Sequence, residues 1–399
     1  MRILILQTAG GFTSTGETGG GVLYILGLAE EWTSTGHQVH FVTNSQDQYR
    51  YSQHPTLTIY RSPAYKAPLN SSPVNFLLGA IFSHLVQWRF LKSLVSKKLL
   101  KPAIILASSP YPSDVLAALR LSRAFGLPAA VYFHHLNPPP WWHPLRRGHV
   151  IRAAINWLLT MFALSLSKLG GLTPVLSHPD QLDRTGWKFQ EWMASQYFLD
   201  VGQESEPRQP VCDACFVGRV APNKGIMDLL QIWRIVTETK PNAKLVIAGQ
   251  AYSRRYEKLI RGYLKRFELL KSVDYRGYLS VEEKRKLLAQ SRLFVYPSYE
   301  EGWSLGVMEA AYYGVVPIIY DLPAYEYLDC KDILVPVGDV LAMAQLIITM
   351  LQDENRTSLI ASRLKATVSG YTRQTIAGNQ IAQFELLLQE HAQDHSRNS

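Results

Sequence analysis

Short apolar runs alternate with stretches of helical periodicity in the first half of the chain. The runs are rich in β-branched and aromatic residues and predict strands: "RILIL" (2–6), "HQVHFVT" (37–43), "LTIYRS" (57–62), "AIILAS" (103–108) and "AAVYFHH" (129–135). A glycine-rich loop and a helix near 20–35 follow the first run. Strands that alternate with helices predict a parallel sheet wrapped by helices.

The second half repeats this pattern. Its predicted strands are "ACFVGRV" (214–220), "AKLVIAG" (243–249), "DYRGYL" (274–279), "RLFVYPS" (292–298), "VVPIIYD" (315–321) and "DILVPV" (332–337). A helix with apolar residues at helical spacing is expected over 225–240, after the first of them. The sequence therefore predicts an α/β protein with two doubly wound, Rossmann-like domains.

A polar segment separates the two halves. Residues 195–212 end in "LDVGQESEPRQPVC", which carries two prolines and no hydrophobic period, as an interdomain linker does. We therefore expect one domain over 1–200 and a second over 201–375. Residues 376–399 are expected to form a C-terminal helix and tail that can pack back on the first domain.

Composition and charge narrow the class of protein. Hydrophobic residues make up 47% of the chain and charged residues 18%, which is typical of a globular protein. The net charge is +9, and residues 60–152 hold 12 Lys and Arg but a single acid, Asp114. This region favours an anionic partner. It lacks a basic helix or aromatic platform of a recognised nucleic-acid-binding kind, so no nucleic acid is expected as a partner.

Two apolar runs indicate a membrane surface. The runs at 75–88 ("NFLLGAIFSHLVQW") and 153–167 ("AAINWLLTMFALSLS") are shorter than the roughly 18–20 residues of a spanning helix. Both contain Trp and have basic flanks, which suits helices lying on an anionic membrane. A buried core helix with a solvated basic end is the alternative. Since "MRILILQ" predicts a strand and not a secretion signal, we expect a cytoplasmic protein at the inner face of the cell membrane.

The three cysteines cannot form a disulfide framework, which fits a reducing compartment. Cys212 and Cys215 make one CxxC motif, but a zinc site would require a second ligand pair nearby, and none is evident. We interpret both as small apolar residues leading into a strand, so a metal or redox site is disfavoured.

Two loops carry groups that can hold an anion. Gly19 and Gly20 stand at the start of the first predicted helix, where glycines let a phosphate or sugar hydroxyl approach free N–H groups; a plain turn is the alternative. In "VGRVAPNKG" (217–225), Arg219 and Lys224 straddle a turn between strand and helix. A bidentate guanidinium and an ammonium together suit a diphosphate, although two solvated bases would give the same pattern.

Two carboxylates surround a glycine turn in "YPSYEEGWSLGVMEAAYYGVVPIIYD" (296–321). Glu301 and Glu309 have seven residues between them, and Gly302 with the amides after it predicts another helix start. Acids repel a bare phosphate but accept hydrogen bonds from hydroxyls. A nucleotide sugar, with phosphates in the middle and a polyol at each end, would suit both the bases and the acids.

These motifs together resemble the retaining glycosyltransferases of family 4, which have the GT-B fold: two Rossmann-like domains whose parallel sheets face each other across a cleft. The resemblance covers nearly the whole chain. The motifs that carry it are "GGGVLYILGLAEEWTSTGHQVHFVT" (19–43), "LPAAVYFHH" (127–135), "FVGRVAPNKG" (216–225) and "EEGWSLGVMEAAYYGVVPII" (300–319). The last resembles the E-x7-E motif and is the most specific.

The resemblance implies roles for the four charged side chains of the second half. Arg219 and Lys224 would bind the donor diphosphate and stabilise it as it leaves. Glu301 would hold hydroxyls of the donor sugar, and Glu309 would hold the nucleotide ribose.

His134 matches the family histidine near the reacting sugar, and its neighbour His135 is an alternative. The remaining donor-binding positions implied by the resemblance are Gly19, Gly20, Gly302, Trp303, Ser304 and Leu305.

The resemblance also implies a reaction. A hexose would pass from a nucleotide sugar, UDP- or GDP-linked, to a lipid-linked or glycan acceptor with its anomeric configuration retained. Preorganised cations and amides would meet the charge of the leaving phosphate, so neither a metal nor another cofactor is expected. The acceptor is expected on the basic, Trp-bearing first half, which binds acceptors in this family.

Three departures from the family pattern concern the acceptor and the hinge. "FQEWMASQYFLD" (189–200) stands where an "NG-D" segment is usual, Gln250 interrupts a glycine pair, and residues 136–200 are rich in Trp, Pro and bases. The rival hypothesis is a non-catalytic GT-B scaffold docked on a membrane. Such a protein would have no need of all four charged donor-site side chains.

Overall fold

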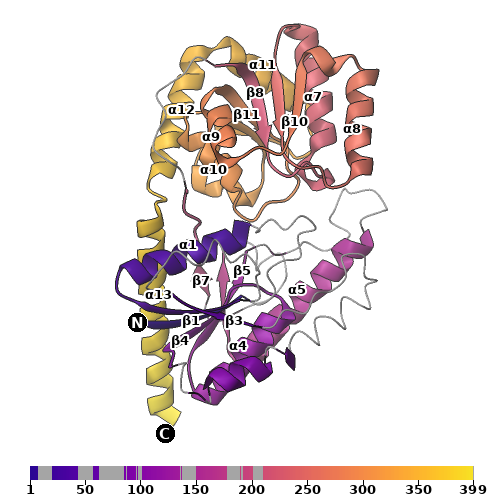
Figure 1. The fold of residues 1–399 in the computed structure, drawn as a ribbon. Coiled ribbons are helices and arrows are strands. Elements are labelled where there is room, and N and C mark those ends of the chain that lie inside the picture. The colour runs from indigo at the N-terminus through magenta and orange to yellow at the C-terminus, as the bar shows by residue number, and fades with distance from the viewer. Residues whose placement is uncertain are drawn as a thin grey trace. The chain divides into compact units, whose positions relative to one another are not determined.

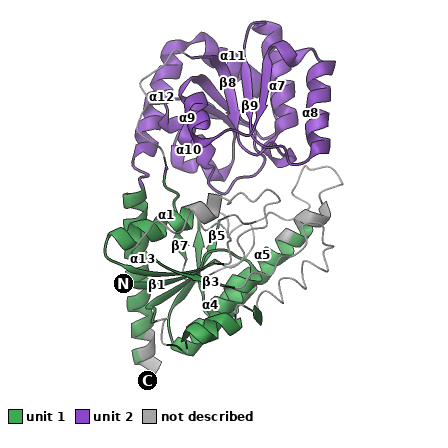
Figure 2. Cartoon of the chain, viewed as in Figure 1, with its two compact units in different colours: residues 1–198, 373–399 green, residues 199–372 purple. Residues whose placement is uncertain are grey.

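The computed structural model describes residues 1–7, 20–43, 57–62, 85–86, 88–95, 97, 101–134, 136, 150–177, 189, 192–200 and 210–398. Gly19, His135 and most of the segments 75–88 and 136–149 lie outside the described residues, and the predictions on them stay predictions. The chain divides into two compact units (Figure 2). Unit 1 comprises residues 1–198 and 373–399, and unit 2 comprises residues 199–372.

Unit 1 is built on a parallel sheet with the strand order β3-β2-β1-β4-β5-β6-β7 among the described residues. Its strands are β1 (Arg2–Gln7), β2 (Gln38–Thr43), β3 (Leu57–Arg61), β4 (Ile104–Ala107), β5 (Ala129–Phe133), β6 (Thr173–Leu176) and β7 (Met193–Ala194). The first five confirm the predicted strands. The pattern missed β6 and β7, because one has four residues and includes a proline and the other has only two.

Helices cover this sheet, and the described ones are α1 (Gly20–Ser34), α4 (Pro112–Phe125), α5 (Val150–Gly170) and α13 (Arg373–Asn398). The C-terminal α13 lies against α1 (Figure 1). The indole N–H of Trp32 donates to the backbone oxygen of Ala377 over 3.0 Å, and the Trp32 ring meets Phe384 edge-on. The last segment of the chain is thus anchored on unit 1 by a fully buried tryptophan.

Unit 2 has a second parallel sheet with the order β10-β9-β8-β11-β12-β13. Its strands are β8 (Cys212–Val217), β9 (Leu245–Ala248), β10 (Val273–Gly277), β11 (Ser291–Tyr296), β12 (Val316–Tyr320) and β13 (Leu334–Val335). The helices are α7 (Ile226–Thr239), α8 (Arg254–Arg266), α9 (Val281–Ala289), α10 (Leu305–Tyr312), α11 (Val340–Gln352) and α12 (Glu354–Ser369). All six predicted strands are confirmed.

In each unit the strand order reverses beside the first strand, between β1 and β4 and between β8 and β11. Loops that leave such neighbouring strands diverge to opposite faces of the sheet, and ligands of doubly wound folds bind at this switch point. In unit 2 the two loops are residues 218–225 after β8 and 297–304 after β11, which carry Arg219, Lys224 and Glu301. The topology therefore brings together motifs that are far apart in sequence.

Cys212 and Cys215 are buried, unpaired thiols within β8. Burial raises the pKa of both thiols above the ordinary value, so neither is a thiolate at neutral pH. This placement agrees with their interpretation as small residues of a buried strand.

Gly225 lets the two switch-point loops of unit 2 touch. Its φ is +65°, a left-handed conformation that favours glycine. A Cβ atom at this position would lie 1.8 Å from the backbone oxygen of Pro297. The turn that carries Lys224 is therefore pressed against the loop that carries Glu301.

Replacing Gly225 with alanine should lower the free energy of unfolding by about 3 kcal/mol or more, because the clash is with backbone and the conformation is strained. Urea denaturation measures this loss. Gly262→Ala, in the middle of α8 where a Cβ meets nothing within 4 Å, is the control and should gain about 0.5–1 kcal/mol. Equal stability of Gly225→Ala and the wild type would contradict the close approach.

Candidate active site

Hydrogen bonds join the two switch-point loops of unit 2. The amide of Tyr299 donates to the backbone oxygen of Asn223 over 3.0 Å, and the side-chain amide of Asn223 donates to Glu300 Oε1 over 2.8 Å. The Ser298 hydroxyl donates to the backbone oxygen of Glu300 over 3.0 Å. These bonds fix the backbone on either side of Lys224 and Glu301.

Lys224 and Glu301 form an ion pair between these loops. Lys224 Nζ lies 2.5 Å from Glu301 Oε1 and 3.4 Å from the backbone oxygen of Glu300. The two side chains are only 14% and 8% exposed. An ammonium has three N–H donors, so this one can still reach a further acceptor. The structure thus brings together two residues that the sequence analysis assigned to one ligand.

The strand predicted over 214–220 ends at Val217, earlier than expected. Arg219 therefore lies in the loop after β8, and its side chain is exposed. The charges of Lys224 and Arg219 both act on Tyr296. The Lys224 ammonium stands over the Tyr296 ring, 5.7 Å from its centroid. Burial, followed by the negative charge of Glu301, raises the pKa of the Tyr296 phenol well above its ordinary value, and the charge of Arg219 opposes this. Both predicted diphosphate-binding cations therefore act on the same small region.

The predicted helix start after Gly302 is the first turn of α10, which begins at Leu305. Ser304 precedes it with φ +59°, which is uncommon for a residue other than glycine and costs of order 1–3 kcal/mol. The side chain of Trp303 is buried and stacked on Tyr327, so only its backbone can serve a ligand. The amides of Val307 and Met308 donate to the backbone oxygen of Ser304, whereas those of Leu305 and Gly306 come too early in α10 for a partner within the helix, which suits an anion at this end.

Glu309 lies on α10 and pairs with a lysine that the sequence analysis did not single out. Lys284 Nζ of α9 lies 2.6 Å from Glu309 Oε1. Their spacing of 25 residues gives no sequence signal, because the contact depends on how α9 packs beside α10.

Asp228 is a second group that sequence reasoning missed. It lies in the first turn of α7, and its Oδ2 accepts hydrogen bonds from the hydroxyls of Tyr299 at 2.5 Å and Tyr320 at 2.7 Å. Burial first, and then the bond to Asp228, raises the pKa of both phenols. The carboxylate ties the start of α7 to the ends of β11 and β12, and so holds the loop that carries Glu301.

In unit 1, His134 follows β5 directly and both of its ring nitrogens have partners. Nε2 lies 2.9 Å from the backbone oxygen of Ser108, which can only accept, so Nε2 carries the proton. Nδ1 therefore accepts from the hydroxyl of Tyr197. The rings of Tyr24 and Tyr132 flank the imidazole.

Burial lowers the pKa of His134 from 6.5 to about 4, although the bond to Ser108 opposes this change. The imidazole is thus neutral and oriented at physiological pH. Its part in the chemistry stays a prediction, as does that of Gly20, whose backbone opens α1.

Among the described residues, no three His, Cys, Asp or Glu side chains gather as a metal site requires. The expected independence from metal stays a prediction.

Two family models match the chain. Residues 19–166 match the Glycosyl transferase 4-like domain, and residues 204–366 match Glycosyl transferases group 1. The first match covers most of unit 1 and the second most of unit 2.

Bacterial mannosyltransferases are similar over part of the chain. The O-antigen chain mannosyltransferase B of Escherichia coli is 26% identical over 176 residues, 44% of this chain and 46% of that protein. The GDP-mannose:cellobiosyl-diphosphopolyprenol alpha-mannosyltransferase of Xanthomonas oryzae is 30% identical over 110 residues, 28% of this chain and 29% of that protein. The chain thus matches less than half the length of these two relatives.

Solved structures resemble the chain over nearly its whole length. Sucrose-phosphate synthase from Thermosynechococcus elongatus has a TM-score of 0.76 at 18% identity and covers 98% of this chain and 99% of its own. Anabaena HepE in complex with UDP-glucose has a TM-score of 0.70 at 15% identity, with 96% and 99% covered. The predicted GT-B fold is confirmed, and the chain's two matched domains are those of glycosyltransferases. Its place in the retaining family 4 stays a prediction.

His134 should make stability depend on pH. Between pH 6.5 and 4 the unfolded chain binds a proton that native His134 does not, so the free energy of unfolding falls as the pH is lowered, by at most about 1.4 kcal/mol per pH unit. Urea denaturation of the wild type and His134→Gln across this range should show a shallower slope in the variant. His37 and His40 also have lowered pKa values but contribute equally to both proteins. Parallel slopes would contradict the neutral state of the half-buried His134.

Proposed function

We propose that the chain is a retaining glycosyltransferase that moves a hexose from a UDP- or GDP-sugar to a lipid-linked or glycan acceptor. The observation that carries the proposal is the pairing of Lys224 with Glu301 and of Lys284 with Glu309 in unit 2, with Lys224 and Glu301 at its switch point. Cations for phosphates and carboxylates for hydroxyls thus occur in the same unit, as a nucleotide sugar requires.

The chemistry follows from this arrangement. Arg219, Lys224 and the first amides of α10 would stabilise the diphosphate as negative charge develops on it. Glu301 would accept hydrogen bonds from the donor sugar and Glu309 from the ribose. The acceptor would attack the same face that the phosphate leaves, and the phosphate would take the acceptor's proton. Fixed cations would make a metal unnecessary.

Named relatives support the choice of donor and acceptor. The Xanthomonas relative is named for a GDP-mannose donor and a polyprenol diphosphate acceptor, and HepE is described in complex with UDP-glucose. UDP and GDP sugars are therefore the first donors to test, and a polyprenol-linked glycan is the first acceptor.

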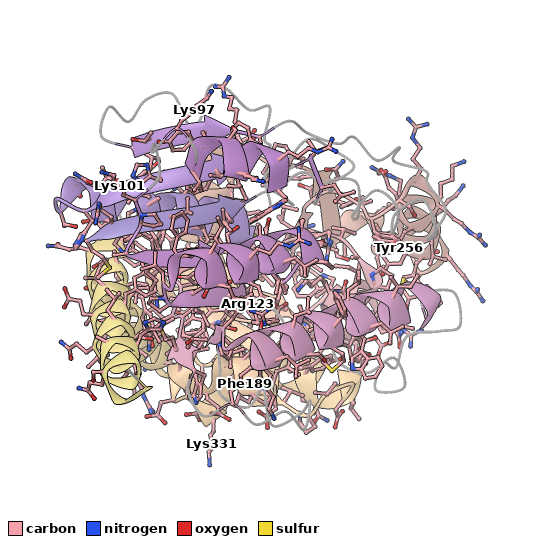
Figure 3. The ribbon with its side chains drawn as sticks, turned by 90° about the horizontal axis from the view of Figure 1, so that it is seen from below. Lys97, Lys101, Arg123, Phe189, Tyr256 and Lys331 are labelled. Atoms are coloured by element: carbon pink, nitrogen blue, oxygen red, sulfur yellow. The ribbon has the colours of Figure 1, made fainter. Side chains whose placement is uncertain are left out.

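The proposed attachment is to the cytoplasmic face of a membrane, and an exposed surface of unit 1 supports contact with lipid. Leu158, Phe162 and Leu169 are spaced along one side of α5 and are 58%, 47% and 82% exposed. α5 packs on α4, whose exposed Arg123 is labelled in Figure 3, and the exposed Lys168 of α5 precedes Leu169. Apolar side chains beside bases suit an interface of anionic lipid. No described helix is long and apolar enough to span a bilayer.

The alternative function is a non-catalytic, membrane-docked scaffold or partner of another transferase. Such a protein would neither bind nor turn over nucleotide sugars.

A thermal-shift screen with UDP, GDP, ADP and CDP sugars, in the presence of a chelator, tests the donor site. A ligand that binds only the folded state raises the melting temperature by mass action, so one nucleotide class should give a shift. Glu309→Ala should lose that shift. If no nucleotide sugar shifts the wild type, the scaffold alternative is favoured.

Arg219→Ala should lower turnover about 10²–10³-fold, because a preorganised charge on the leaving group is lost. The side chain is exposed, so the melting temperature should stay within a degree or two. Lys258→Ala, which removes an exposed base from α8, is the control and should keep the wild-type rate. Release of nucleoside diphosphate measures the rate, and an unchanged rate in Arg219→Ala would remove the diphosphate assignment.

Sedimentation with vesicles of phosphatidylglycerol tests the membrane surface. Phe162→Ser should reduce binding several-fold through the loss of buried apolar area, and salt should weaken binding of the wild type. Leu359→Ser, at a position of α12 in unit 2 that is 73% exposed, is the matched control and should bind like the wild type. No wild-type binding at low salt would refute the membrane attachment.

A further inference from the structure

The partner of Glu309 is a lysine in an unusual place. α9 begins at Val281 with a capping box, in which Ser280 and Glu283 exchange hydrogen bonds. The N-terminal end of a helix carries positive partial charge, which suits Glu282 and Glu283 but not a lysine. Lys284, the fourth residue of this helix, therefore lies near an end where a positive charge is electrostatically unfavourable. Its contact with Glu309 offers another reason for a cation there.

Lys284 can contact a ligand while it holds Glu309. Its side chain is 29% exposed, whereas that of Glu309 is 15% exposed. Among the described residues, Glu309 Oε1 is the acceptor of the Lys284 ammonium, which has three donors. Two N–H groups of Lys284 and the second oxygen of Glu309 thus stand next to each other.

This pair matches a vicinal diol. A hydroxyl can donate to a carboxylate oxygen while its own oxygen accepts from an ammonium, so two adjacent hydroxyls satisfy both groups at once. We propose that Lys284 binds the ribose of the donor nucleotide together with Glu309, and so selects a nucleotide with both ribose hydroxyls. The inference rests on the proposed function, because it takes Glu309 as the ribose-binding carboxylate.

Lys284 could instead contact a phosphate of the nucleotide. Contact with the ribose diol and contact with phosphate have different effects on nucleotide affinity. A lysine on phosphate strengthens the binding of any nucleoside diphosphate. A lysine on the diol strengthens only the binding of nucleotides that carry the hydroxyls. A nucleoside diphosphate and its 2′,3′-dideoxy analogue, which share base and phosphates, separate these cases.

Calorimetric titration of the full chain with UDP and GDP and with their dideoxy analogues is the test. We expect the wild type to bind the ribonucleotide that it recognises at least about tenfold more tightly than the dideoxy form, since one charge-assisted hydrogen bond corresponds to about that factor. Lys284→Met should weaken the ribonucleotide by about tenfold and leave the dideoxy form within twofold. Lys284→Arg should restore most of the preference. Lys286→Met, which removes an exposed charge two residues away, should match the wild type.

Three results would overturn the inference. Equal weakening of both nucleotides in Lys284→Met would assign Lys284 to phosphate. Unchanged binding of both would leave Lys284 as a partner of Glu309 only. If the wild type bound neither nucleotide, the proposed function would fail as well, which distinguishes that failure from the other two.

Discussion

The candidate site depends on an ammonium and a carboxylate that lie 2.5 Å apart and are largely removed from water, those of Lys224 and Glu301. Such a pair adds little to the stability of the fold, because the cost of removing the two charges from water offsets much of their attraction. The pair forms only if the loop after β8, which carries Lys224, and the loop after β11, which carries Glu301, are held at a fixed distance from each other. Gly225 permits their contact, and Asn223 joins them by hydrogen bonds. These two residues therefore keep the loops close enough for Lys224 and Glu301 to pair.

The two units share a topology but differ in the chemistry at the carboxyl ends of their strands. In unit 2 the side chains there are charged and in contact, and Asp228 braces the loop beside them. In unit 1, His134 is a neutral imidazole among tyrosines, held by Ser108 and Tyr197. Charges suit a diphosphate, whereas both ring nitrogens of His134 are taken by protein partners. This difference fits the proposed division between a donor side and an acceptor side.

The sequence predicted what local pattern determines. β9, β11 and β12 are buried almost throughout and appear as apolar runs, so a local pattern was enough to locate them. Arg219, Lys224 and Glu301 were found because they lie in short loops with glycine beside a strand end. Lys284 was not, since its importance arises only when α9 packs beside α10.

Asp228 and Tyr197 escaped prediction for the same reason, as each gains its partner through the sheet and not through the chain. The two-residue β7 has no pattern of its own, because its strand character comes from pairing with β6. Contacts between residues on different strands or helices could therefore not be predicted from this single sequence.

A crystal structure with the nucleoside diphosphate bound, grown with a chelator, would show where the diphosphate lies. We expect phosphate oxygens within hydrogen-bonding distance of Arg219 and Lys224, with the ribose against Glu309 and no metal between the phosphates. A nucleotide bound away from the loops after β8 and β11, or a bound metal bridging its phosphates to the protein, would contradict this expectation.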